Sequence, residues 1–136
     1  MKSQILQDLR TMYDIPKPAI GIDVDGTIDQ APEFFSVLSN SWPGDVHIIT
    51  MRSDMATLVN DLKAWNIRYS KIHLVNTFSD KGKVIDALKL VMFFDDMPEV
   101  LQAVDCKYNV CLIRNDGNFN ADTSKYIMST NTAELI

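Results

Sequence analysis

The sequence predicts an α/β fold in which a mostly parallel, five-stranded sheet is covered by helices on both faces. Short apolar runs alternate along the chain with segments whose apolar residues recur at helical spacing, and this alternation is typical of βαβ units. The inner runs lack regular polar positions, as expected of strands that are buried on both faces. The chain has 136 residues, so we expect one domain over 1–136 with its core at about 19–114.

Each element follows from local sequence signals. Apolar spacing predicts an N-terminal helix at about 3–13, while the polar segment 115–136 is expected to be a helix or a tail. The expected strands are the apolar runs 19–23, 46–49, 71–75, 90–94 and 108–113. The expected starts of the remaining helices are Pro32, Ser53 or Asp54, Ser79 or Asp80, and Pro98.

Charge and composition exclude several classes of protein. The net charge of −5 argues against a broad basic surface for nucleic acid, although it leaves room for a small basic pocket. No apolar run approaches the roughly 18 residues that span a bilayer, and the first residues lack a secretory signal. The two cysteines, Cys106 and Cys111, are interpreted as reduced packing residues. We therefore expect a cytoplasmic protein without a membrane segment.

Asp23 and Asp25 follow the first predicted strand, where an open α/β sheet places its ligand crevice. Residues two apart in an extended chain point to the same side, and Gly26 allows the chain to turn away sharply. Two carboxylates this close repel each other unless a cation or a shared proton offsets their charge. The pattern therefore indicates a metal site.

Other strands also end in residues that can carry chemistry. Thr50 ends the second strand, Asp95 and Asp96 end the fourth, and Lys81 lies near the start of the helix before it. The carboxyl ends of parallel strands share one edge, so these side chains can converge. Carboxylates, a hard cation, a hydroxyl and an ammonium group together suit phosphoryl transfer.

The ordered set resembles the haloacid dehalogenase (HAD) superfamily of phosphatases. Its first motif, Asp-x-Asp-Gly-Thr, is matched at 23–27, and its second, an apolar strand ending in Thr or Ser, at 48–50. Its lysine motif is matched at 80–83 and its acidic motif at 93–96. The resemblance implies a three-layer Rossmann-like, HAD-like fold and a Mg²⁺-dependent phosphomonoester hydrolase that forms an aspartyl phosphate.

The resemblance also implies roles for the acidic residues. Asp23 would be the nucleophile and a metal ligand. Asp25 would be the general acid/base and would bind the metal through its backbone carbonyl. Asp96 is favoured as the direct Mg²⁺ ligand, with Asp95 as a partner of Lys81 or of a metal-bound water, and the reverse order is left open.

The phosphate-binding residues implied by the resemblance are Thr50, Lys81 and Arg52. Lys83 is a rival for the role of Lys81. Arg52 resembles the Thr/Ser-x-Arg arrangement of polynucleotide 3′-phosphatase domains, and its alternative interpretation is an ion pair with Asp54.

The gaps between the motifs bear on access to the site. From Thr27 to Thr50 there is room for one helix and one strand, and from Thr50 to Lys81 for a helix, a strand and a loop. Neither gap can therefore hold a cap domain. An open site suits a large substrate, such as a phosphorylated polymer end or a protein, or else it needs another subunit as a lid. The expected partner is a phosphorylated nucleotide, metabolite or polymer end. The alternatives are a polynucleotide 3′-phosphatase or nucleotide phosphatase as the specific activity, a phosphotransferase, and a non-catalytic binding module of the same fold. A homo-oligomer formed through the N-terminal helix or around Phe34 and Phe35 is left open.

Overall fold

The computed structural model describes residues 2–13, 17–104 and 108–115. Its centre is a five-stranded sheet in the order β3-β2-β1-β4-β5, and every neighbouring pair of strands is parallel. This confirms the predicted α/β fold with a parallel sheet. The strands are β1 (Ile20–Ile22), β2 (Val46–Thr50), β3 (Lys71–Leu74), β4 (Met92–Asp95) and β5 (Val110–Leu112).

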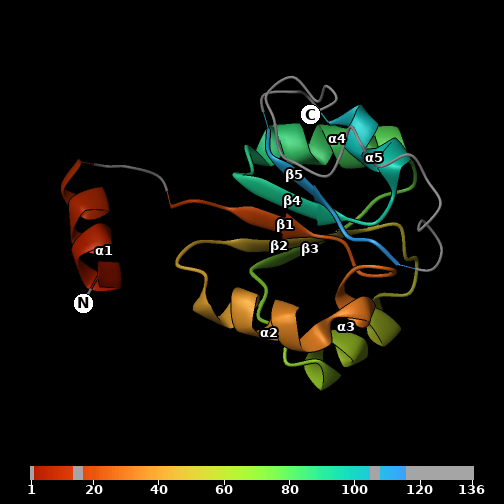
Figure 1. Cartoon of the computed structure of the whole chain (residues 1–136), viewed down its shortest axis with the longest axis horizontal. Helices are drawn as coiled ribbons and strands as arrows, with labels where there is room; N and C mark the ends of the chain where they lie inside the picture. Colours follow the sequence, from red (N-terminus) through yellow and green to blue (C-terminus); the bar gives the residue numbers. More distant parts are fainter. Residues whose placement is uncertain (1, 14–16, 105–107, 116–136) are drawn as a thin grey trace.

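Helices cover both faces of the sheet and complete three layers (Figure 1). Helices α4 and α5 lie on one face and α2 and α3 on the other, while α1 lies to one side of the sheet (Figure 1). The helices are α1 (Lys2–Tyr13), the 3₁₀ helix η1 (Ile28–Gln30), α2 (Pro32–Ser41), α3 (Met55–Ala64), α4 (Phe78–Leu88) and α5 (Pro98–Ala103).

Two apolar clusters hold the layers together, because successive residues of a strand point to opposite faces. Along β2, Ile48 joins the cluster that contains Leu58 and Leu62 of α3. Its neighbour Ile49 joins the cluster that contains Ile85 of α4 and Val100 of α5. The inner strands β1 and β2 are therefore buried along their whole length, as the continuous apolar runs predict.

Some predicted boundaries were wrong. Helix α4 begins at Phe78, and its N-cap is Thr77 rather than Ser79 or Asp80, because the Thr77 hydroxyl accepts a hydrogen bond from the backbone N–H of Asp80 at 3.0 Å. Strand β4 starts at Met92 rather than at residue 90. Lys89 has a left-handed backbone, with φ of 52°, so the chain must still turn there before it can pair with β1.

No cap domain interrupts residues 17–104. The chain between β1 and β2 forms only η1 and α2, and α3 is the one helix between β2 and β3. The edge at which the strands end is thus free of an inserted domain, as predicted. In the described residues, no helix has the length and apolarity needed to cross a membrane. The predictions for Cys106 and for 116–136 lie outside the described residues.

Candidate functional site

The strand order brings the ends of three neighbouring strands to one point. The chain moves outward from β1 to β2 and β3, then returns to the other side of β1 with β4 and β5. Open α/β sheets place their ligand crevice where the order reverses in this way, at the carboxyl ends of the strands. Asp23 directly follows β1, Thr50 ends β2 and Asp95 ends β4.

Lys81 reaches into this point from the first turns of α4. Its Nζ donates to Asp23 Oδ1 at 2.6 Å and to Asp95 Oδ2 at 2.7 Å, and its side chain is only 3% exposed. Burial lowers the pKa of Lys81, but the two carboxylates outweigh burial and raise it. The lysine is therefore held charged between the ends of β1 and β4. Lys83, the rival in the sequence, is 76% exposed and pairs with Asp80 at 3.7 Å.

Three carboxylates gather around this lysine. Asp23, Asp95 and Asp96 each offer an oxygen that lies within 4.8 Å of the others. Burial raises the pKa of Asp23 to about 7, and the charge of Asp95 adds to the rise while Lys81 opposes it. Burial likewise raises the pKa of Asp95 against the effect of Lys81. Asp23 and Asp95 therefore hold protons more tightly than an exposed aspartate, chiefly because burial disfavours their charged forms.

The donor chemistry of the cluster fits a divalent cation. The single charge of Lys81 is shared between Asp23 and Asp95, so these two carboxylates alone leave an excess of negative charge when both ionise. Carboxylate oxygens are the hard ligands that Mg²⁺ prefers. Asp23, Asp95 and Asp96 are the residues that would hold the ion.

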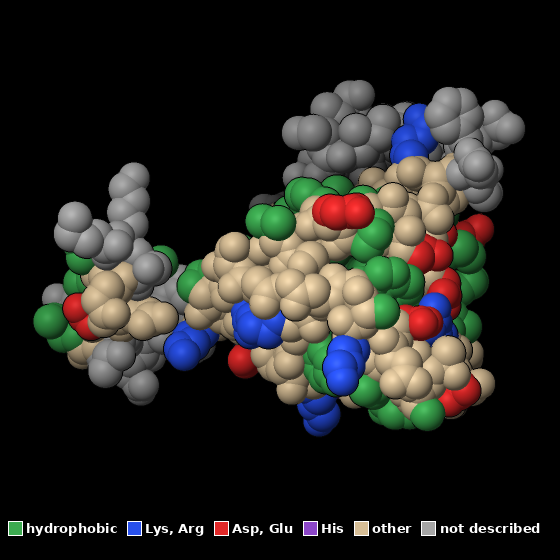
Figure 2. Space-filling model, turned by 90° about the horizontal axis from the view of Figure 1, so that it is seen from below, with side chains coloured by type: hydrophobic (Ala, Val, Ile, Leu, Met, Phe, Trp, Pro, Cys, Tyr) green, Lys and Arg blue, Asp and Glu red, His purple; other side chains and the backbone are tan. Residues whose placement is uncertain are grey.

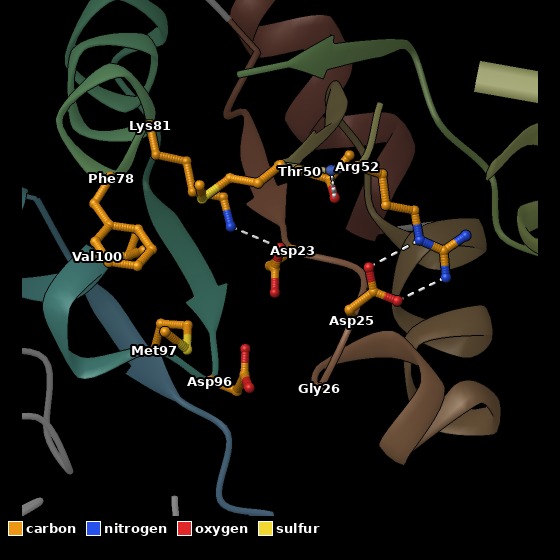
Figure 3. Close-up of a pocket in the computed structure, with 11 residues that line it drawn as sticks. Asp23, Asp25, Gly26, Thr50, Arg52, Phe78, Lys81, Asp96, Met97 and Val100 are labelled. Atoms are coloured by element: carbon orange, nitrogen blue, oxygen red, sulfur yellow. Dashed lines mark hydrogen bonds and ion pairs between the residues drawn. The ribbon is translucent and has the colours of Figure 1, made fainter. Parts of the chain in front are cut away.

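The Asp25 carboxylate is not part of this cluster. Arg52 binds it through two hydrogen bonds, from Nε at 2.9 Å and from Nη2 at 2.7 Å, and also donates to Asp61 at 2.6 Å. Figure 3 shows Asp25 turned toward Arg52 and away from Asp23. The alternative interpretation of Arg52 as a partner of Asp54 is not seen, because Asp54 caps α3 by accepting from the backbone N–H groups of Ala56 and Thr57.

Two hydroxyl groups complete the floor of the site. Thr50 is 1% exposed, and its hydroxyl accepts a hydrogen bond from the backbone N–H of Arg52 at 3.2 Å. Thr27 is fully buried and donates to Asp23 Oδ2 at 3.3 Å. Both Asp23 oxygens are therefore oriented by donors, one from Thr27 and one from Lys81.

Gly26 permits the close approach of the first motif to Asp96. Its φ is +81°, and a Cβ at this position would collide with the Asp96 carboxylate. Asn115, which lies beyond β5, donates to both the Gly26 carbonyl at 2.9 Å and Asp96 Oδ2 at 3.0 Å. The turn after β1 and the end of β4 are thus joined by one amide group.

An open pocket of about 470 Å³ is lined by Asp23, Thr50, Lys81 and Asp96, among others. Asp23 lies in the middle of the view in Figure 3, with Arg52 and Asp25 to one side of it and Phe78, Met97 and Val100 to the other. The pocket therefore has a charged side and an apolar side, with the carboxylates between them.

Most of the residues expected from the sequence meet in this pocket. It is lined by Asp23, Asp25, Thr50, Arg52, Lys81 and Asp96, and Asp95 lies beneath, bound to Lys81. The sequence interpretation missed Asn115, Asp61, Phe78 and Met97. Asn115 alone carried a usable signal, because it follows the last predicted strand at the same edge of the sheet as the other site residues.

Comparisons with known proteins identify one similar solved structure and no similar sequence. No family model matches the chain, and no curated protein matches its sequence. A solved structure titled "Crystal structure of universal stress protein in complex with cAMP" aligns with a TM-score of 0.48 and 13% identity, over 73% of this chain and 98% of that one. At this level of similarity its ligand is not transferred to this chain.

These findings contradict the predicted family. The matched structure is a universal stress protein, a different Rossmann-like family, and neither sequence comparison supports the haloacid dehalogenase superfamily. The predictions of superfamily membership, of a hydrolase or phosphatase, and of an aspartyl-phosphate mechanism through Asp23 and Asp25 are corrected accordingly. The physical reason is that acidic residues at the ends of parallel strands occur in many Rossmann-like folds, so a short motif does not specify the chemistry.

Proposed function

We propose that the chain binds a phosphorylated ligand together with Mg²⁺ in the pocket at the carboxyl edge of the sheet. The observation that carries the proposal is the cluster of Asp23, Asp95 and Asp96, of which Asp23 and Asp95 are buried and ion-paired to Lys81. A ligand site built only for a cation would not need the lysine, and a site built only for an anion would not place three carboxylates in its floor. The combination suits a cation and an anion that bind together.

The charges decide how the two ligands depend on each other. The carboxylates of Asp23 and Asp95 together exceed the single charge of Lys81, and the charge of Arg52 is already matched by Asp25 and Asp61. A phosphate group entering alone would therefore meet net negative charge. Mg²⁺, when bound, would supply the positive charge that offsets these carboxylates, and Lys81 and the hydroxyl of Thr50 would contact the phosphate.

Isothermal titration calorimetry on the full chain tests this proposal. Inorganic phosphate should bind in the presence of Mg²⁺ and show no binding in EDTA. Asp96→Asn should lower the affinity for Mg²⁺ by roughly tenfold or more, because it removes one of three anionic ligands. Glu33→Gln is the matched control, since Glu33 is exposed on α2.

Two outcomes would contradict the proposal. Phosphate that binds equally well in EDTA and in Mg²⁺ would show that no cation is needed. An Asp96→Asn variant with the Mg²⁺ affinity of the wild type would show that the cluster does not hold the ion.

A further inference from the structure

We propose that Phe78, Met97 and Val100 form a subsite for a flat aromatic group carried by the phosphorylated ligand. The inference rests on the proposed function, because it assigns a ligand class to the same pocket. The class is a phosphate ester with a planar aromatic group, to which the nucleoside monophosphates belong.

The apolar side of the pocket is formed by residues at the N-terminal ends of α4 and α5. Phe78 is the first residue of α4 and Met97 is the N-cap of α5, whose backbone N–H donates to Asp95 Oδ1 at 2.9 Å. Val100, one turn into α5, is fully buried and closes the wall behind them. Asp95 therefore binds both Lys81 and the backbone of Met97. This shared residue fixes the position of the apolar wall relative to the charged cluster.

The two helices are packed closely enough to keep the wall rigid. A Cβ at Gly82 of α4 would lie 2.6 Å from the carbonyl oxygen of Ala103 in α5, so only glycine permits this approach. Phe78 and Met97 are each only partly buried against the core, and they line the pocket. A ligand group placed against them would remove apolar surface from water.

The size of the pocket exceeds what a phosphate group requires. Its volume of about 470 Å³ lies in the range of sites that bury small organic ligands. In Figure 3 the apolar wall stands across Asp23 from Arg52, so a ligand with its phosphate near Asp23 has room for a second group on the side of Phe78.

The chemistry of the wall favours an aromatic group in that second position. A phenylalanine ring offers a stacking surface, and a methionine thioether makes favourable contacts with aromatic rings. A long nucleic acid is a poorer fit, because the chain carries a net charge of −5. On the face over α2 and α3, seen in Figure 2, the Lys and Arg side chains also stand as separate groups. A small ester is therefore the ligand that the pocket suits.

Calorimetry of the full chain at saturating Mg²⁺ tests the subsite with two matched pairs of ligands. Adenosine 5′-monophosphate is compared with ribose 5-phosphate, and phenyl phosphate with cyclohexyl phosphate. The aromatic member of each pair should bind about tenfold more tightly, the effect expected of one stacked ring. Inorganic phosphate is quantified in each sample, so that turnover of a ligand is not mistaken for binding.

Variants then assign the preference to the wall. Phe78→Ala should abolish the aromatic advantage and leave the affinity for inorganic phosphate unchanged, and Phe78→Leu, which keeps an apolar side chain against the core, should lower the advantage. Phe34→Ala is the matched control, because Phe34 is 55% exposed on α2 at the other face of the sheet.

The possible failures separate the two proposals. Equal affinities within each pair, or an equal loss for both members in Phe78→Ala, would overturn the subsite while Mg²⁺-dependent phosphate binding stands. A preference for adenosine 5′-monophosphate without one for phenyl phosphate would show recognition of polar base edges and would also overturn it. If no phosphate compound binds, the proposed function fails and the subsite fails with it.

Discussion

Arg52 holds Asp25 in a fork of two hydrogen bonds, at 2.9 and 2.7 Å, at the mouth of the pocket. The side chain of Asp25 is 59% exposed, whereas that of Arg52 is 20% exposed and forms a second ion pair with Asp61. An entering phosphate group would compete with Asp25 for the same guanidinium, because this group binds carboxylate and phosphate with the same geometry.

The first prediction follows from this competition. Asp25→Asn should strengthen Mg²⁺-dependent phosphate binding by roughly fivefold, since an exposed ion pair contributes up to about 1 kcal/mol. Arg52→Ala should weaken it by a similar or larger factor, because two carboxylates then lack their partner. Titration of inorganic phosphate at saturating Mg²⁺ measures both effects.

Asp61→Asn is the control for this pair, since it removes the partner of Arg52 that does not line the pocket and leaves the two hydrogen bonds to Asp25 intact. We expect a smaller gain from it than from Asp25→Asn. A loss of phosphate affinity in Asp25→Asn would instead show that Asp25 itself contacts the cation or the ligand.

The second prediction concerns the two lysines of the same segment. Lys81→Met should destabilise the metal-free protein by about 3–5 kcal/mol, because it leaves the buried carboxylates of Asp23 and Asp95 without their ion pair. Lys83→Met should cost less than about 1 kcal/mol, since Lys83 is exposed and its ion pair is long. Urea denaturation in EDTA compares the two, and equal losses would contradict the buried pairing.

The sheet and the position of its site could be predicted from local patterns. Continuous apolar runs specify strands buried on both faces, and a parallel sheet then places Asp23, Thr50 and Asp95 at one edge whatever the details of the helices. This inference needs only the hydrophobic periodicity and the chain order.

Hydrogen-bond partners that only tertiary packing brings together could not be predicted from the sequence. Arg52 chooses Asp25 and Asp61 over the nearby Asp54, because the first turn of α3 already engages Asp54 as its cap. Asn115, which follows the edge strand β5, donates to the carbonyl of Gly26, which follows the central strand β1. The family and the reaction were wrong for a related reason, since both were inferred from a motif whose physical content is a strand end, a turn and two acids.

The third prediction is a pH dependence of stability in the absence of metal. The pKa of Asp23 is raised from 3.8 to about 7 in the folded protein, so between these values the folded state binds more protons than the unfolded state. The contribution of Asp23 to the free energy of unfolding should therefore fall as the pH rises from about 4 to 7. The raised pKa of Asp95 acts in the same direction, while Lys81 stays charged in both states throughout this window. Burial lowers the pKa of His47 and of His73, and these two groups contribute in the opposite direction below pH 6.5.

Thermal unfolding in EDTA across this pH range measures the effect. The stability of the wild type relative to Asp23→Asn should decline over this range, because an amide does not titrate, and Glu33→Gln should keep the pH dependence of the wild type. Mg²⁺ should restore the lost stability of the wild type near pH 8 and do little near pH 5, where protons occupy the ligands. A difference in stability between the wild type and Asp23→Asn that stays constant from pH 4 to 7 in EDTA would contradict the raised pKa of Asp23.

The last prediction tests the turn that joins the first motif to Asp96. Gly26→Ala should destabilise the protein by about 1–3 kcal/mol, because alanine is strained at a φ of +81° and its Cβ would displace the Asp96 carboxylate. It should also weaken Mg²⁺ binding, since Asp96 is a proposed ligand. Lys89→Gly is the converse control: its φ of 52° favours glycine, so stability should rise slightly with Mg²⁺ affinity unchanged. Denaturation measures the change in stability, and calorimetry measures the change in Mg²⁺ affinity. A destabilised Gly26→Ala variant with the Mg²⁺ affinity of the wild type would show that Asp96 is not a ligand.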